Sequence, residues 1–411
     1  MSALVLQHRL AVLNRVIGLV EKKHFNPALN GANWPELVER HRARVLAAED
    51  TERFEGEIAN LLSQLKTSHT GFFHRRLRSI PARHAINATF LPHRVNGATT
   101  WMFQDVHEGG PAFAAGIRPG DILLDINGEL VLPPTQPVFA MGQAASLGVE
   151  TLSGERRSIQ LDIPTPKSRK RPIGQPRAVS WKVTRPGIGL LKIAMFPGAI
   201  GVDLARDIDR ALSDFRECTR LIVDLRGNTG GGIGGLRLMS YLTPDKRPVG
   251  YSLTKKRAAR GYRREDLIQF GRIPGRKLAL IVLALRYALV EKSIAVITEG
   301  LGPRPFHGRV VIVVNEHSAS AAEIVAAFAR ENKLATIVGR KTPGRLMSGG
   351  TFRAGHGFIL GLPTAAYLTW EGTLIEGNGI EPEVAVELSR EALKDGIDTQ
   401  LEQAIEVAQA L

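Results

Sequence analysis

The sequence predicts a multidomain α/β protein with a helical N-terminal domain, a small β-rich domain and an α/β core. At 411 residues the chain is too long for one ordinary domain, so two or three domains are expected. Hydrophobic residues make up 44% of the chain, enough for each domain to bury a core. From Trp181 to Leu388, strand-like and helix-like segments alternate, which is typical of parallel strands covered by helices.

The helical domain is expected over residues 1–80. Apolar residues recur every three to four positions in LAVLNRVIGLVEKK and in FEGEIANLLSQL, which is the period of amphipathic helices. The turn-forming segment NPALNGANWPE separates them. Polar residues interrupt the N-terminal segment, which does not resemble a signal peptide, and charges interrupt the apolar stretch 278–297. We therefore expect no membrane span and a cytoplasmic location.

The β-rich domain is expected over residues 85–165. Its centre is VHEGGPAFAAGIRPGDILLDINGELV, in which Pro111 can open a short helix and Gly116 can end it. Asn127 and Gly128 form a two-residue hairpin signal. The turn residues and the apolar residues together resemble a PDZ domain. This resemblance implies a module that adds a ligand strand to the edge of its sheet and often captures a peptide C-terminus.

Basic residues gather in two places along the chain. A proline-rich linker is expected at residues 166–180, around PTPKSRKRPIGQPR, and the basic segment 251–277 is expected at the surface. The net charge is +14, but aromatic residues make up only 6% and no stacking motif accompanies the cations. No specific nucleic-acid partner is therefore expected. The single Cys218 excludes an internal disulfide and a cysteine-rich metal site.

The α/β core is expected over residues 181–411. Its predicted strands include IGLLKIAMF, RLIVDLRG and RVVIVVNE, and its predicted helices include GVDLARDIDRALSDF, IGGLRLMSYL and SAAEIVAAFARENK. The C-terminal DTQLEQAIEVAQAL is an amphipathic helix, for which Thr399 and Glu402 form the predicted capping box. Ligand sites in parallel sheets lie where strands end and helices begin. Two such junctions stand out, Asp224–Gly232 and Asn315–Glu323.

The second junction contains the segment HSASAAE, which fits a helix start. Ser320 and Glu323 match the capping box S-x-x-E. The same turn would set the N–H of Ala321 at the positive end of a helix, where it can form half of an oxyanion hole. The glycine-rich DLRGNTGGG of the first junction can supply the other half. That segment lacks the G-K-[ST] ending of a P-loop, so a nucleotide site is not expected.

Four segments carry a family resemblance: LIVDLRGNTGGG, VVNEHSASAAE, VGRKTPGR and IEGNGIEPEVAVE. With the PDZ-like segment, they resemble the C-terminal processing (tail-specific) and tricorn-type serine peptidases. The resemblance implies a crotonase-like ββα protease core, no metal or organic cofactor, and peptides or unfolded proteins as substrates, including recognition of their C-termini. It leaves the oligomeric state open, a homo-oligomer included. The implied nucleophile is Ser320 rather than Ser318, and the implied supporting and glycine-turn positions are Glu323, Thr342, Gly230 and Gly231.

One position departs from the commoner pattern of this family. Tail-specific members have a lysine base in T-x-G-K-G, whereas this chain has Arg345 in TPGRL. A guanidinium stays protonated at working pH and cannot accept a proton. The tricorn branch instead uses a tetrad of Ser, His, Ser and Glu, and KTSHTG resembles its Ser-His pair. This resemblance implies that His69 is the base for Ser320 and that Ser68 connects His69 to Glu376.

The sequence leaves alternatives to this interpretation. Lys341, His317 and His356 are other candidate bases, and Glu371 is a second candidate acid. Arg345 in the lysine position is also consistent with a non-catalytic peptide-binding protein that keeps the fold. Retinoid-binding proteins have a similar core, so a ligand carrier is a further alternative. The sequence favours an active serine endopeptidase, because every tetrad position is filled.

Overall fold

The computed structural model describes residues 5–75, 79–95, 97–165, 176–198, 201–232, 234–275, 293–302 and 306–411. Contacts divide the chain into two compact units. The first comprises Met1–Leu77, Lys246–Thr298 and Gly344–Gly379, and the second comprises Arg78–Asp245, Glu299–Pro343 and Ile380–Leu411. Most of the predicted linker and most of the apolar stretch 278–297 lie outside the described residues. The units follow contacts rather than sequence boundaries, so the bounds of the four predicted segments stay predictions.

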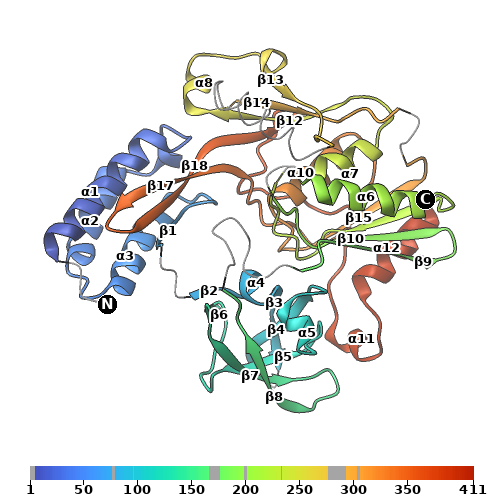
Figure 1. The fold of residues 1–411 in the computed structure, drawn as a ribbon, viewed down its shortest axis with the longest axis horizontal. Helices are drawn as coiled ribbons and strands as arrows, with labels where there is room; N and C mark the ends of the chain where they lie inside the picture. Colours follow the sequence, from blue (N-terminus) through green and yellow to red (C-terminus); the bar gives the residue numbers. More distant parts are fainter. Residues whose placement is uncertain are drawn as a thin grey trace. The chain divides into compact units, whose positions relative to one another are not determined.

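Three N-terminal helices form the helical part of the first unit, as the apolar period predicts: α1 (Leu6–Lys23), α2 (Trp34–Leu46) and α3 (Thr51–Ser63). The side chains of Asn33 and Asp50 cap α2 and α3 by accepting hydrogen bonds from backbone N–H groups of the first turn. The buried faces of the helices share one hydrophobic cluster with Phe72 and Phe358 of the neighbouring sheet. Figure 1 shows these helices in blue beside strands β17 and β18.

The sheet of the first unit runs in the order β1-β18-β12-β14-β13, with β17 paired to β18. Its strands are β1 (Gly71–His74), β12 (Pro248–Thr254), β13 (Ile268–Phe270), β14 (Ile294–Ile297), β17 (Met347–Gly355) and β18 (Phe358–Thr369). The expectation that segment 251–277 lies at the surface is wrong for its strands, because Tyr251, Leu253 and Phe270 are buried. Strand β12 pairs on both sides, with β14 and β18, so long-range pairing buries a short apolar segment that is surrounded by cations in the sequence.

The PDZ-like part of the second unit is an antiparallel sheet in the order β3-β4-β5-β7-β8. Its strands are β3 (Ala88–Val95), β4 (Ala98–Val106), β5 (Ile122–Ile126), β7 (Ala144–Glu150) and β8 (Arg156–Asp162). Helix α5 (Pro111–Ala114) begins at Pro111, as predicted. Asn127 and Gly128 have φ angles of 55° and 79° and turn the chain back after β5, which confirms the hairpin signal.

The core sheet of the second unit runs in the order β19-β16-β15-β11-β10-β9. Strands β10 (Ile188–Ile193), β11 (Arg220–Asp224), β15 (Arg309–Val314), β16 (Thr336–Gly339) and β19 (Val384–Ala385) are parallel, whereas β9 (Val179–Arg185) is antiparallel to β10. Helix α12 (Thr399–Ala410) covers one face through Ala404, Ile405 and Ala408. Figure 1 shows α6 (Val202–Asp214), α7 (Gly235–Tyr241) and α10 (Ala321–Glu331) on the other face.

The cap of α12 differs from the prediction by one residue. Asp398 is the N-cap, and its Oδ1 accepts a hydrogen bond from Leu401 N at 3.1 Å. The predicted box of Thr399 and Glu402 is therefore wrong: Thr399 Oγ1 donates instead to Glu387 O at 2.5 Å. Two adjacent residues that both suit a cap made the sequence ambiguous here.

The predicted fold class is confirmed: helical N-terminal elements, a PDZ domain and a mixed α/β core are present. Among the described helices, none combines the length and apolar character that crossing a membrane requires. Within the same described ranges, His, Cys, Asp and Glu side chains form no group of three that could hold a metal ion.

Candidate active site

The two predicted junctions lie at the same edge of the core sheet. The glycine turn, Asp224–Gly232, follows β11, and the serine turn, Asn315–Ser320, follows β15. Strands β11 and β15 are parallel neighbours, with Asp224 opposite Val313. Parallel neighbours end at one edge of a sheet, so both turns open where α/β folds carry their ligand sites.

Ser320 has an unusual backbone conformation at the start of α10. Its φ and ψ are 57° and −116°, and a positive φ is costly for a residue with a Cβ. Its N–H donates to Glu323 Oε2 at 2.9 Å. The fully buried Glu323 also accepts a hydrogen bond at Oε1 from Thr342 Oγ1 at 2.6 Å. Glu323 and Thr342 therefore support the backbone of Ser320, which suits the supporting positions that the resemblance implies.

Ser318 has a different environment from Ser320. It is fully buried, and its Oγ donates to Leu225 O at 2.8 Å and accepts from Asn315 N at 2.9 Å. These bonds tie the serine turn to the glycine turn. Ser320, by contrast, is only half buried. The contacts of Ser318 are those of a structural hydroxyl, so Ser320 remains the candidate nucleophile.

The glycine turn packs directly against Ser320. A Cβ on Gly230 would lie 2.5 Å from Ser320 Cβ, and a Cβ on Gly231 would lie 2.0 Å from Phe196 O, so neither position has room for a side chain. The N–H of Gly230 donates to Asn228 Oδ1 at 2.8 Å. Among the described residues, none accepts a hydrogen bond from the N–H of Gly231 or of Ala321. Of the two glycines, Gly231 is therefore the better candidate for an oxyanion donor.

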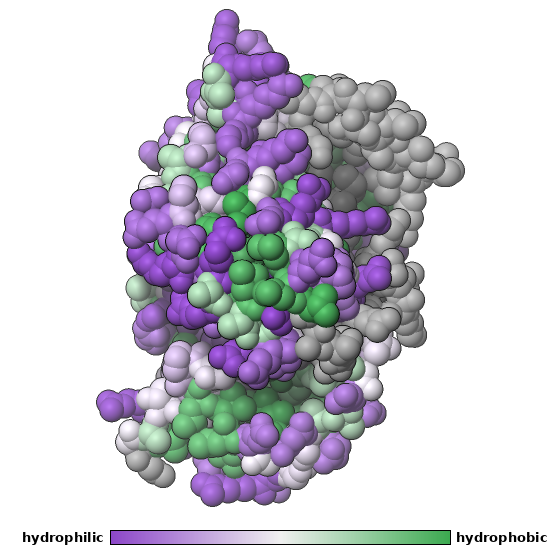
Figure 2. Space-filling view, turned by 90° about the vertical axis from the view of Figure 1, so that its left-hand side faces the viewer, coloured by the Kyte–Doolittle hydropathy of each residue, from purple (hydrophilic) through white to green (hydrophobic). Residues whose placement is uncertain are grey.

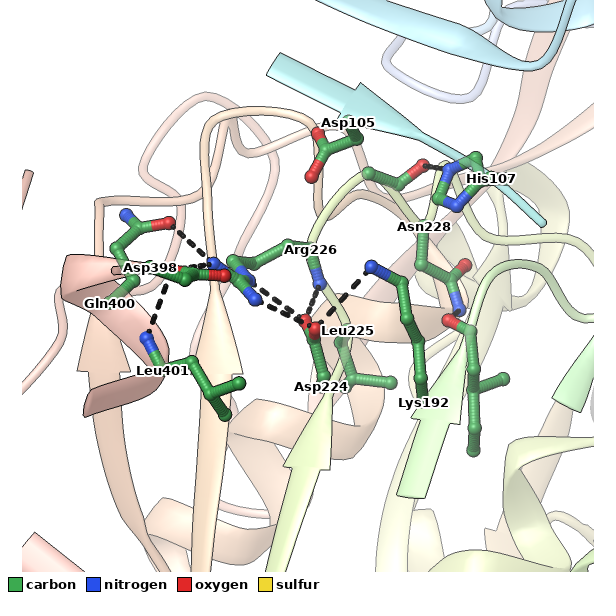
Figure 3. A network of polar contacts seen from close by, with 12 residues as sticks. Asp105, His107, Lys192, Asp224, Leu225, Arg226, Asn228, Asp398, Gln400 and Leu401 are labelled. Carbon is green, nitrogen blue, oxygen red and sulfur yellow. Dashed lines mark hydrogen bonds and ion pairs between the residues drawn. The ribbon is translucent and has the colours of Figure 1, made fainter. Parts of the chain in front are cut away.

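A buried charge network holds the base of the glycine turn (Figure 3). The guanidinium of Arg226 contacts Asp224 at 2.9 Å and Asp398, the N-cap of α12, at 2.8 Å. Lys192 Nζ lies 3.4 Å from Asp224 Oδ2. Burial alone would raise the pKa of Asp224, but the Arg226 and Lys192 cations outweigh it and hold the pKa well below its ordinary value. The turn is thus anchored by ionised side chains beneath it.

A second cluster of candidate residues belongs to the first unit. Ser68 Oγ donates to Glu376 Oε2 at 2.8 Å and lies 2.7 Å from His69 Nδ1, and Ser68 N donates to Glu376 Oε1 at 2.6 Å. Leu346 N also donates to Glu376 Oε2, at 2.8 Å. Ser68 gives its one hydroxyl hydrogen to Glu376, so it accepts a hydrogen from His69 Nδ1. The lone pair of the neutral imidazole is then on Nε2, the nitrogen that would serve a base.

Arg345 lies at the wall of a cavity in the first unit. The cavity has a volume of about 420 Å³, and its lining includes Lys66, Ser68, Arg345 and Glu376. The Arg345 side chain is exposed to solvent. Arg345 therefore lines the same cavity as Ser68 and Glu376, but its guanidinium cannot act as a base.

The alternative bases and the alternative acid have contacts of other kinds. Lys341 Nζ pairs with Glu381 at 2.5 Å, with both side chains more than half exposed. His317 Nε2 lies 3.0 Å from Phe90 O, and the ring of His356 stacks on His8 with centroids 4.0 Å apart. Glu371 is exposed in the turn that follows β18. None of these contacts sets up a proton acceptor in the way that Ser68 and Glu376 do for His69.

The structure brings the predicted residues together in two groups. Ser320, Ala321, Glu323, Thr342, Gly230 and Gly231 belong to the second unit, and Ser68, His69, Arg345 and Glu376 belong to the first. Sequence reasoning missed three polar residues that hold the turns: Asp105, Asn228 and Asn315. Asn228 and Asn315 stand within the motifs and could have been noticed as polar residues at strand ends, whereas no sequence signal connects Asp105 to the core.

Two family models match the chain. The one described as Peptidase family S41 matches residues 187–386, and the one described as PDZ domain matches residues 102–147. The putative tricorn protease homolog 2 of Streptomyces coelicolor is 22% identical over 92% of this chain and 30% of its own length. The carboxy-terminal-processing protease of Bartonella bacilliformis is 26% identical over 71% of this chain and 59% of its own length. The chain therefore spans less than two thirds of the length of these relatives.

Solved structures share the fold. The photosystem II D1 C-terminal processing protease matches with a TM-score of 0.57 and 17% identity over 98% of this chain and 97% of that one. The tricorn protease matches with a TM-score of 0.52 and 18% identity over 98% of this chain and 36% of that one. Residues 187–386 are thus similar to peptidase family S41, and the region ahead of them is similar to a PDZ domain.

Proposed function

We propose that this chain is a serine peptidase in which Ser320 is the nucleophile and His69 is the general base. The hydrogen-bond chain from Glu376 through Ser68 to His69 carries the proposal, because it directs the imidazole lone pair to Nε2. A neutral imidazole is suited to accept a proton from a serine hydroxyl near neutral pH. Because the two groups belong to different units, the proposal requires Ser320 and His69 to meet in the acting enzyme.

The proposed reaction proceeds through an acyl-enzyme. Ser320 Oγ attacks the carbonyl carbon of a peptide bond while His69 Nε2 takes its proton, and the N–H groups of Ala321 and Gly231 bind the oxyanion. His69 then passes the proton to the leaving amine, the C–N bond breaks, and an ester remains on Ser320. Water attacks this ester, gives one proton to His69, and releases the acid as the proton returns to Ser320. Each step uses side chains and backbone groups of this chain.

The PDZ domain is the proposed substrate-positioning module, acting on peptides or unfolded chains, including their C-termini. A PDZ sheet edge can add an extended peptide as a further strand. The domain exposes Leu130, Leu132 and Val138, and Figure 2 shows hydrophobic side chains gathered over it at the bottom of that view. Exposed apolar groups suit the apolar side chains of an unfolded polypeptide.

Hydrolysis of an unfolded protein by three variants tests the assignment. We expect Ser320→Ala and His69→Ala each to lower kcat by at least about 1000-fold, because each removes a group that acts in the bond-breaking step. His356→Ala is the matched control, because that exposed histidine stacks on His8, and it should keep the parent rate. Full activity in His69→Ala would refute the base assignment.

Arg345 supports a second candidate, a peptide-binding protein that no longer cleaves. In this case the folded parent would bind unfolded chains through its PDZ domain, yet Ser320 would not react with a fluorophosphonate probe. Labelling that is present in the parent and lost in Ser320→Ala would decide for the peptidase, because the probe reports an activated serine without requiring the right substrate.

A further inference from the structure

The end of strand β4 in the PDZ domain contacts both turns of the proposed site within the second unit. Asp105 Oδ2 accepts a hydrogen bond from Asn315 Nδ2 at 2.9 Å, at the start of the serine turn. His107 Nε2 lies 3.2 Å from the carbonyl oxygen of Gly227 in the glycine turn. Figure 3 shows both PDZ side chains beside the backbone that carries Arg226 and Asn228. Both contacts are buried, so water does not compete for them.

The side-chain amide of Asn315 connects Asp105 to both the glycine turn and the serine turn. Its Oδ1 accepts hydrogen bonds from Gly227 N and from His317 N, each at 3.1 Å, and its side chain is fully buried. The carboxylate of Asp105 can only accept, so the NH₂ end of the amide must face Asp105. The oxygen end must then face Gly227 and His317. Asp105 therefore selects the amide orientation that binds the glycine turn to the serine turn.

Gly227 fits closely between the two PDZ side chains. A Cβ there would lie 2.8 Å from Asp105 Cβ and 2.8 Å from His107 Nε2, and the φ of Gly227 is 71°. Burial lowers the pKa of His107, which keeps the ring neutral near pH 7 with Nε2–H as the donor to Gly227 O. Gly227, within the glycine turn, is thus held at both its N–H and its carbonyl oxygen.

We infer that Asp105 and His107 are positioning residues for peptide hydrolysis, supplied to the core by the PDZ domain. Acting through Asn315 and Gly227, they fix the glycine turn against the serine turn and thereby aim the N–H groups of Gly231 and Ala321. This inference rests on the proposed function. It differs from substrate capture, because these side chains face the core and not a bound peptide.

An exchange of the two side chains tests the contact between Asp105 and Asn315. Asn315→Asp opposes two buried carboxylates, whereas adding Asp105→Asn to it restores one donor and one acceptor. Asp105→Asn alone can keep the bond, because its amide oxygen can accept from Asn315 as the carboxylate does. For a short chromogenic peptide, we expect Asn315→Asp to lower kcat about 10- to 100-fold with little change in KM, and Asp105→Asn alone to have a much smaller effect. The double variant should recover to within roughly threefold of the parent. Asp162→Asn, an exposed PDZ position on β8, is the control that should match the parent.

Amide hydrogen exchange supplies a readout that does not depend on activity. Asn315→Asp should speed exchange at residues 226–232 and 315–321, and the double variant should reverse this change. An Asn315→Asp variant that keeps both the parent kcat and the parent exchange would overturn the inference, as would a double variant that recovers neither. If the parent neither cleaves nor reacts with a fluorophosphonate, the proposed function fails. The hydrogen-exchange experiment would still test whether the contact between Asp105 and Asn315 holds the two turns.

A second pair of variants tests the inference if the variants at Asp105 and Asn315 do not fold. His107→Gln keeps an N–H donor for Gly227 O, whereas His107→Ala removes it. We expect His107→Ala to lower kcat about 10-fold or more and His107→Gln to recover most of that loss. Equal effects of the two substitutions on kcat and on exchange of the turn would overturn the role of His107.

Discussion

At the scale of residues, both groups assigned to proton transfer have strained backbones. Ser320 has a φ of 57° and His69 a φ of 58°, in a region that residues with a Cβ rarely adopt. In each case a glutamate binds a neighbouring backbone N–H: Glu323 binds that of Ser320, and Glu376 binds that of Ser68. The two acids thus stabilise unusual local conformations as well as supplying charge. The sequence showed which residues matter, but not that they are held in this way.

Replacement of Glu323 by Gln tests this conformational role. The carboxylate accepts one hydrogen bond at each oxygen, from Thr342 and from Ser320 N, whereas an amide offers only one oxygen. We expect the free energy of unfolding to fall by about 1–3 kcal/mol, because a buried donor loses its acceptor, and we expect kcat to fall as well. Urea unfolding measures the first effect. Glu217→Gln, at a highly exposed position, is the control, and an equal loss in both variants would contradict the role of Glu323.

At the scale of elements, the sequence located strands β10, β11 and β15, helices α6, α7, α10 and α12, and the two strand-to-helix junctions of the core. It failed where one residue or one long-range pairing decides the outcome. The cap of α12 is Asp398 rather than Thr399, and β12 is an inner strand despite its basic surroundings. The sequence also treated Gly230 and Gly231 as equivalent. Only the folded turn shows that the Gly230 N–H is bound to Asn228, because that bond depends on how the chain doubles back.

Replacement of Gly231 by Ala tests the glycine turn as an element. The added methyl would lie 2.0 Å from Phe196 O at a φ of 135°, so the turn must shift. We expect loss of fluorophosphonate labelling and a clear decrease in unfolding free energy. Gly18→Ala is the matched control: this glycine lies within α1 with nothing near its Cβ position. It should raise stability by about 0.5–1 kcal/mol, and a Gly231→Ala variant that labels normally would contradict our account of the turn.

At the scale of the whole molecule, the sequence predicted the order of a helical part, a PDZ domain and an α/β core. It also nominated a base and a nucleophile 251 residues apart in the chain, at His69 and Ser320. It could not show that segments 246–298 and 344–379 join the N-terminal helices in one compact unit. Nor could it show that Asp105 reaches the core. Both features arise from contacts between distant segments, for which a single sequence holds no local signal.

The buried titratable groups of the second unit make its stability dependent on pH. Burial lowers the pKa of His107 below its ordinary 6.5, so the unfolded chain binds a proton there before the folded chain does. Stability should therefore fall as pH decreases below 6.5, and a further loss should begin below 3.8, where unfolded Asp224 takes up its proton. Urea unfolding at pH 7.5 and at pH near 5 measures the first step. His107→Gln should lose less stability than the parent over this interval, and an equal loss would contradict the assignment.

The exposure of Arg345 limits how substitutions could replace the proposed catalytic base of this protein. A lysine base works only where burial lowers its pKa, yet the side chain at this position is open to water. A substitution of Arg345 by Lys would therefore install a hydrated ammonium that stays protonated at neutral pH. No single codon change at this position can restore the lysine chemistry of the tail-specific relatives. A lysine could replace the proposed histidine base only after other substitutions had closed this position to solvent.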